Sequence, residues 1–91
     1  MMRSEEYQVI SPDHFLRLLD DTDFQTKFIL LHLSKDYERS IRRLINIAER
    51  ELYLDLDPRE RQKVAKRFQS RLSVLEFEKR VERRGDRWKL K

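Results

Sequence analysis

The chain has 91 residues and a formal net charge of +4, and its charged fraction of 42% exceeds its hydrophobic fraction of 38%. This length fits one domain, and the absence of cysteine excludes disulfides, thiol catalysis and thiolate metal sites. A P-loop requires a pair of glycines and a dinucleotide-binding fingerprint requires three, so the single glycine, Gly85, excludes both. We therefore expect a protein that is not an enzyme, with no catalytic residues, no metal site and no cofactor.

No segment of the sequence is suited to a membrane. The longest nearly unbroken apolar run covers residues 28–33, which is far shorter than the roughly 20 residues of a membrane-spanning helix. The first ten residues contain no apolar segment typical of a signal peptide. We therefore expect a soluble cytoplasmic protein with no membrane partner. The abundance of arginine and glutamate is common in proteins from hot environments, and it also occurs in highly charged mesophilic domains.

Charge is distributed unevenly along the chain. Residues 1–38 hold four basic and eight acidic side chains, a net charge of −4, and residues 39–57 are neutral. Residues 58–91 hold 13 basic and five acidic side chains, a net charge of +8. This asymmetry favours a polyanionic partner, more often nucleic acid than a membrane surface. An uneven surface of ion pairs is the alternative explanation.

The first half of the domain predicts two helices. Residues 1–10 form a polar leader, of which residues 7–10 fit a short strand, and the single domain covers residues 11–91. Ser11 before Pro12 predicts the start of a helix that ends near residue 21. A second helix is expected over residues 24–35, and it is apolar nearly all round, which predicts a central, buried helix.

Two further helices follow. Apolar residues at helical spacing predict a third helix over about residues 37–52, with Arg39 and Arg43 on its polar face. Asp57 before Pro58 predicts the start of a fourth helix, which reaches about residue 76. Three neighbouring aspartates at residues 20–23 could bind a divalent ion, but we expect them to end one helix and cap the next.

After about residue 80 the apolar pattern changes to a period of two, which is typical of strands. Gly85 stands where a two-residue hairpin turn requires a positive φ. This turn pairs Val81 with Leu90 and Arg83 with Trp88. Trp88 could stack on a nucleic-acid base, but its place on the apolar side of the hairpin predicts a core residue. The expected fold class is thus mainly α with a small C-terminal β-hairpin.

The outer face of the fourth helix has no acidic residue, although a solvated helix usually mixes both signs. This composition favours contacts to phosphates and base edges. The candidate DNA-binding residues on this face are Arg59, Gln62, Lys63, Lys66 and Ser70. The hairpin adds Arg83, Arg84 and Arg87, which would lie beside a DNA backbone or in a minor groove, or would only protect the edge of the hairpin.

Three helices followed by the hairpin over residues 81–90 resemble a winged helix-turn-helix DNA-binding domain, with the helix near the N-terminus as an addition. The resemblance covers about residues 24–91 and implies that the hairpin is the wing and that residues 58–76 form the recognition helix. It also implies a short strand near residues 37–39 and a second helix from about residue 40. The family often has a glycine before the wing, where this chain has Glu78, Lys79 and Arg80.

This resemblance implies a transcriptional regulator with double-stranded DNA as partner. Arg39 and Arg43 would then contact phosphates, and a homodimer through the N-terminal helix and residues 7–10 would read two half-sites. The main alternative is a protein-interaction or assembly module on the same fold that does not touch nucleic acid. RNA binding is a third possibility, and a metal-dependent nuclease built on the aspartates is a distant fourth.

Overall fold

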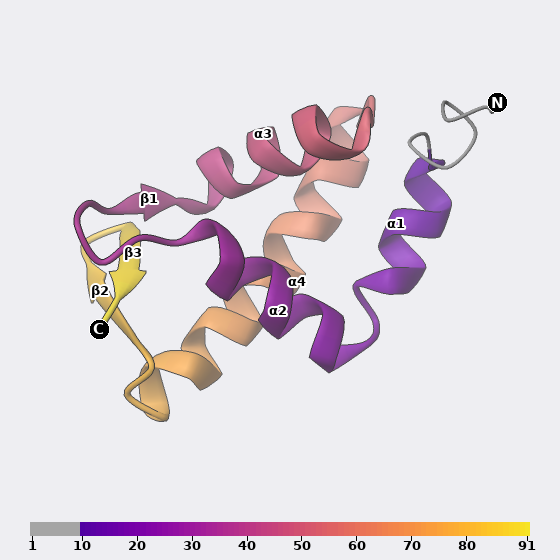
Figure 1. The fold of residues 1–91 in the computed structure, drawn as a ribbon. Helices are drawn as coiled ribbons and strands as arrows, with labels where there is room; N and C mark the ends of the chain where they lie inside the picture. The colour runs from indigo at the N-terminus through magenta and orange to yellow at the C-terminus, as the bar shows by residue number, and fades with distance from the viewer. Residues whose placement is uncertain (1–9) are drawn as a thin grey trace, which may run out of the picture.

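A computed structural model describes residues 10–91, which form four helices and a three-stranded antiparallel sheet. In chain order the elements are α1 (Pro12–Leu18), α2 (Thr22–His32), β1 (Arg39–Ser40), α3 (Ile41–Leu52), α4 (Pro58–Phe77), β2 (Val81–Arg84) and β3 (Arg87–Leu90). Helix α4 contacts α1, α2, α3 and β2, and Figure 1 shows α1 and the sheet near its two opposite ends. The prediction of a mainly helical fold with a C-terminal hairpin is confirmed.

The predicted strand over residues 7–10 lies outside the described residues except for Ile10, which is not in a strand and packs against the core. No helix in the part of the chain that the structure describes is both long enough and apolar enough to cross a membrane.

Side-chain caps begin the helices. The Ser11 hydroxyl accepts a hydrogen bond from the backbone N–H of His14, and Asp57 forms a capping box with Glu60 at the start of α4. Both starts were predicted from the sequence. The junction of α1 and α2 differs from the prediction. Helix α1 ends at Leu18 rather than near residue 21, and α2 begins at Thr22 rather than at residue 24, with Asp21 as its N-cap. Helix α2 ends at His32 rather than at residue 35.

The segment before α3 is a strand and not the first turn of a helix. Arg39 and Ser40 pair with Trp88 and Arg87 of β3, so the predicted helix start near residue 37 is wrong. Ser40 then caps α3 through a hydrogen bond from the backbone N–H of Arg43. The strand that the family resemblance implied near residues 37–39 is therefore present, displaced by about one residue.

The hairpin has the predicted register. Val81 is opposite Leu90 and Arg83 is opposite Trp88, while Gly85 in the turn has a φ of 65°. Antiparallel pairing with β1 on the other side of β3 gives the sheet order β1-β3-β2.

The joint between α4 and the hairpin is a Schellman motif. The backbone N–H of Arg80 donates to the carbonyl of Leu75, and the N–H of Lys79 donates to the carbonyl of Glu76. Lys79 has a φ of 63°, so a lysine occupies the left-handed position for which glycine is normally favoured. The chain thus makes the turn into the hairpin without the glycine that the resemblance implied.

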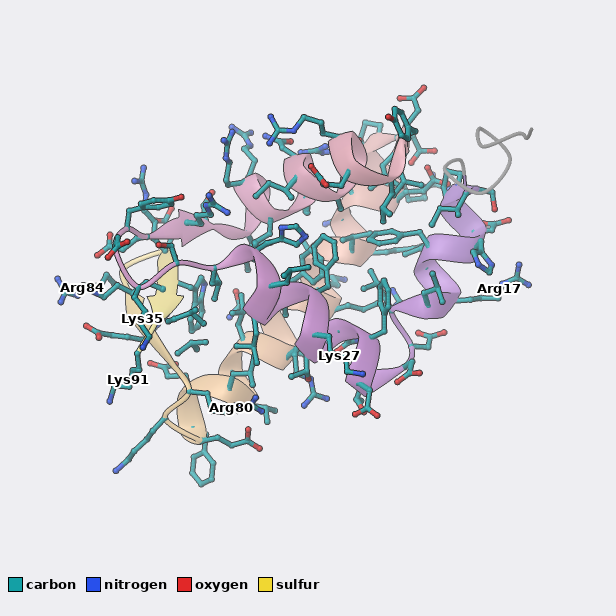
Figure 2. The ribbon with its side chains drawn as sticks, viewed as in Figure 1. Arg17, Lys27, Lys35, Arg80, Arg84 and Lys91 are labelled. Atoms are coloured by element: carbon teal, nitrogen blue, oxygen red, sulfur yellow. The ribbon has the colours of Figure 1, made fainter. Side chains whose placement is uncertain are left out.

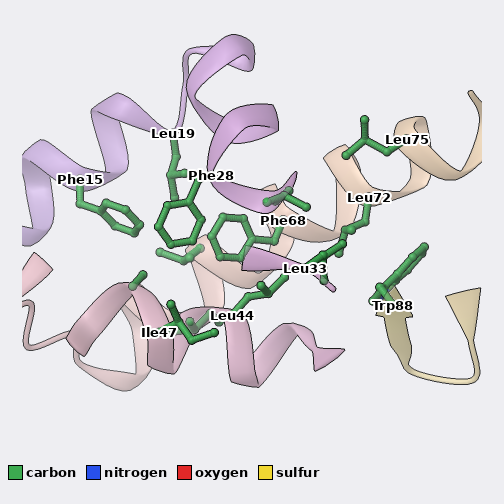
Figure 3. Close-up of a cluster of buried hydrophobic side chains, with 14 of the residues drawn as sticks. Phe15, Leu19, Phe28, Leu33, Leu44, Ile47, Phe68, Leu72, Leu75 and Trp88 are labelled. Atoms are coloured by element: carbon green, nitrogen blue, oxygen red, sulfur yellow. The ribbon is translucent and has the colours of Figure 1, made fainter. Parts of the chain in front are cut away.

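One hydrophobic core runs from α1 to the sheet (Figure 3). Phe68 of α4 is fully buried and stacks on Phe28 of α2, with 5.7 Å between the ring centroids. Phe15 and Leu19 close the core at the α1 end, and Trp88 extends it to the sheet, where its side chain is only 2% exposed. The prediction that Trp88 is a core residue is confirmed.

Helix α2 is not buried on all sides, which corrects the prediction from its apolar composition. Leu31 is 76% exposed, so one apolar position of the helix faces solvent. Gln25 takes a buried position instead, and its side-chain amide donates to the carbonyl of Leu19 and accepts from Nε of Arg71. Because both ends of the amide have partners, its burial costs little.

Candidate nucleic-acid interface

The outer face of α4 is positively charged and without paired charges. Its predicted site residues are all exposed: Arg59, Gln62, Lys63, Lys66 and Ser70. Within residues 10–91, no carboxylate forms an ion pair with any of the three cations among them. Their charge is therefore available to a partner in solution.

The remaining basic side chains of α4 hold the helix to its neighbours. Arg61 forms an ion pair with Glu49 of α3, and Arg67 forms one with Asp20, with 3.1 Å between Nη2 and Oδ1. Arg71 donates to a side-chain amide on α2. The helix therefore has two kinds of basic residue: those near the packed side have structural partners, and those on the outer face do not.

An open hollow of about 500 Å³ lies where β1 and the first turn of α3 meet β3. Four arginines line it, namely Arg39, Arg42, Arg43 and Arg87, and Glu38 is its single acidic residue. The first turn of α3 has no acidic residue, in contrast to the first turns of α1, α2 and α4. Because a helix N-terminus carries partial positive charge, the arginines there add to a region of positive potential.

Two further hollows continue this surface to α4. One of about 310 Å³ lies between α3, α4 and the hairpin, and its lining includes Arg42, Gln69, Arg83 and Asp86. The other, of about 560 Å³, lies along α4 and is lined by Ile41, Gln62, Ala65, Lys66, Gln69 and Ser70. Neighbouring hollows share residues, so the three form one surface from the hairpin to α4, which we call the basic groove.

The basic groove brings together most of the predicted site residues. Those that line it are Gln62, Lys66, Ser70, Arg83, Arg87, Arg39 and Arg43. Arg59 and Lys63 are exposed on the same face of α4 but do not line any of its hollows. Sequence reasoning missed Arg42 and Gln69, each of which lines two hollows. The signal for Arg42 was its position next to Arg43 at a helix start.

Three of the predicted residues have partners within the protein, and one of them is Arg83, whose guanidinium lies over the ring of Trp88 at 5.8 Å. Arg84 pairs with Glu82, with 3.0 Å between Nη2 and Oε2, and lies 3.8 Å from a carboxylate oxygen of Glu38. Arg39 is half-buried, donates to the backbone carbonyl of His32, and lies over the ring of Tyr37 at 5.0 Å. Arg84 and Arg39, which have the stronger of these contacts, are thus less free to bind a ligand than Arg87 and Lys66, which form no ion pair with any other residue that the structure describes.

Local interactions shift two pKa values near the groove. The hydrogen bond from Arg84 lowers the pKa of Glu82, which keeps this carboxylate charged and its arginine neutralised. Burial lowers the pKa of His32, whose backbone carbonyl accepts the hydrogen bond from Arg39. The imidazole is therefore held in its neutral form to lower pH than in a free peptide.

Further basic side chains surround the end of the molecule that contains the sheet. Figure 2 shows Lys35, Arg80, Arg84 and Lys91 extending outward there, whereas Arg17 extends from α1 at the opposite end. Lys35, Arg80, Arg84 and Lys91 come from the C-terminal segments and from the loop before β1. Part of the positive charge of the C-terminal third thus lies around the sheet, while Arg61 and Arg67 are paired elsewhere along α4.

No protein-family model matches this chain, and neither a curated protein nor a solved structure matches it.

Proposed function

We propose that this chain is a winged-helix domain that binds double-stranded DNA through the basic groove and acts in transcriptional regulation. In this proposal α4 enters the major groove, the first turn of α3 lies at the phosphate backbone, and the hairpin is the wing. The observation that supports it best is the continuity of the basic groove, to which α3, α4 and the hairpin contribute exposed cations that form no ion pair within residues 10–91.

The dimensions of α4 support this arrangement. Its 20 residues make a helix about 30 Å long, and the major groove is about 12 Å wide, which admits one α-helix. The face turned away from the core has no carboxylate over residues 62–74, so no like charge would face the phosphates there. Arg83 and Arg87 of the hairpin would then lie beside the adjacent backbone or minor groove.

The test is the salt dependence of binding to a labelled mixed-sequence duplex, measured by fluorescence anisotropy. Each phosphate contact contributes about −0.9 to the slope of log K against log salt. The double variant Lys63→Ala/Lys66→Ala should therefore reduce the magnitude of the slope by about 2 and weaken binding. A matched double variant, Arg17→Ala/Lys27→Ala, removes the same charge from exposed positions of α1 and α2 and should leave the slope unchanged.

Two outcomes would contradict the proposal. If the chain does not bind the duplex even at low salt, it is not a DNA-binding protein of this kind. If both double variants lose affinity equally, the protein binds through its overall charge and not through α4. An RNA duplex serves as a competitor, since its deep, narrow major groove does not admit a helix and it should compete poorly.

The exposed apolar residues favour a second candidate function, contact with another protein or with a second copy. Phe77 at the end of α4 is 87% exposed and Leu31 of α2 is 76% exposed, so each offers a large apolar side chain to a partner. Sedimentation equilibrium of the wild type and of Phe77→Ser tests this function. A homodimer that the variant abolishes supports it, whereas a wild-type monomer argues against self-association.

A further inference from the structure

The part of the basic groove along α4 combines an apolar floor with two free amides. Ile41 and Ala65 are half-buried at its base, and Gln62 and Gln69 are exposed on its rim. Within residues 10–91 neither of these glutamine side chains forms a hydrogen bond with the protein, in contrast to the buried and fully bonded Gln25. Two amide groups therefore face solvent beside an apolar surface.

This combination matches one kind of base pair. In the major groove adenine presents an acceptor at N7 and a donor at N6, which a glutamine amide can satisfy at the same time. Its partner thymine presents the C5 methyl group, which requires an apolar contact. A guanine–cytosine pair has no methyl group, and guanine presents two acceptors, which suit arginine or lysine better.

We infer that the basic groove recognises adenine–thymine pairs, with Gln62 and Gln69 bonded to adenines and with Ile41 and Ala65 against thymine methyl groups. This inference rests on the proposed binding of DNA and adds the base preference. Lys66 lies between the two glutamines on the same face of α4 and supplies charge for a phosphate or a neighbouring guanine.

The spacing of the glutamines sets the separation of the pairs. Gln62 and Gln69 are about two helical turns apart, or about 10.5 Å along the axis of α4. Base pairs are stacked about 3.4 Å apart along the duplex axis, and a helix in the major groove is inclined to that axis, so the two recognised pairs should be separated by at most about three steps. A single short element of sequence, rather than general richness in adenine and thymine, is therefore the expected target.

The first experiment selects bound duplexes from a random library with the full chain. The expected result is enrichment of two adenine–thymine pairs separated by at most about three steps. On the selected duplex, Gln69→Ala and Gln62→Ala should each reduce the preference for adenine–thymine over guanine–cytosine at one position, by about 5- to 150-fold. Ser73→Ala is the matched control on the outer face of α4 but outside the groove, and it should keep the full preference.

The second experiment replaces one thymine of that duplex with uracil, which removes only the methyl group. The expected result is weaker binding by the wild type at the positions that face Ile41 and Ala65. If duplexes bind with normal salt dependence but show no such preference, or if both glutamine variants keep it, this inference is wrong while the proposed function stands. If no duplex binds even at low salt, the inference and the proposed function both fail.

Discussion

Lys79 occupies a backbone position that an L-residue adopts only at a cost, and this leads to a quantitative prediction. Its φ is 63°, and it stands between α4 and the hairpin, in the Schellman motif that ends the helix. A left-handed conformation costs a residue with a Cβ atom about 1–2 kcal/mol. Glycine avoids that cost but has about 0.5–1 kcal/mol more backbone entropy to lose on folding. The difference predicts that Lys79→Gly raises the free energy of unfolding by about 0.5–1 kcal/mol.

Thermal and urea unfolding followed by circular dichroism measure this effect. For a domain of this size the gain corresponds to an increase in Tm of about 2–8 °C. Two controls separate the backbone effect from others. Lys79→Ala keeps the Cβ atom while removing the charge, and should change stability by less than about 0.5 kcal/mol. Glu78 has a φ of −79°, which carries no left-handed strain, so Glu78→Gly should lower the free energy of unfolding by about 0.5–1 kcal/mol.

The reasoning is refuted if Lys79→Gly lowers stability, because the position then carries no strain for glycine to relieve. It is also refuted if Lys79→Ala raises the free energy of unfolding as much as Lys79→Gly does. The effect would then come from removal of the charge and not from the backbone.

Three further predictions concern the core and the titrating groups. Phe68→Ala should lower the free energy of unfolding by about 3–5 kcal/mol in urea denaturation because it opens a cavity in the core, whereas Phe77→Ala, at an exposed position, should change it little. Burial lowers the pKa of His32 below 6.5, because the folded protein favours the neutral imidazole. The stabilisation from this preference should be complete above pH 6.5 and be lost as the pH falls through the folded-state pKa, and His32→Gln should remove this pH dependence of the free energy of unfolding. The hydrogen bond from Arg84 lowers the pKa of Glu82, so the NMR titration midpoint of this carboxyl should lie below 4.5 and should rise toward 4.5 in Arg84→Ala, and an unchanged midpoint would contradict this assignment.

The features that were predictable from the sequence depend on local chemistry. Ser11 and Asp57 cap helices because their side chains bond to backbone groups only three residues away. Gly85 sets the hairpin register because a short turn leaves only one alignment of the flanking strands that buries Val81 and Trp88. The outer face of α4 was likewise visible, since its position follows from helical periodicity alone.

The features that were missed depend on contacts between distant parts of the chain. The residue pattern did not indicate strand β1, which has two residues and no alternation and which only the family resemblance implied; its pairing with β3 makes it a strand. The contact of Arg84 with Glu38 joins residues far apart in sequence, whereas its closer partner, Glu82, is only two residues away. Arg42 enters the groove because the hairpin folds back beside the start of α3, and its position next to Arg43 was the one local sign of this. The left-handed turn at Lys79 was missed because the residue type gives no sign of it.

The direct passage of β1 into α3 has a consequence for any partner of the groove. Ser40 belongs to the sheet and also caps the helix, so the chain has no loop between these two elements. The hairpin is therefore fastened at one side to α4 and at the other, through β1, to α3. The backbone of a surface held in this way is preorganised, so the conformational entropy lost when a ligand binds comes mainly from the side chains. The same connections fix the distances between α3, α4 and the hairpin along the groove. A partner that does not match these distances therefore has to change its own shape to bind.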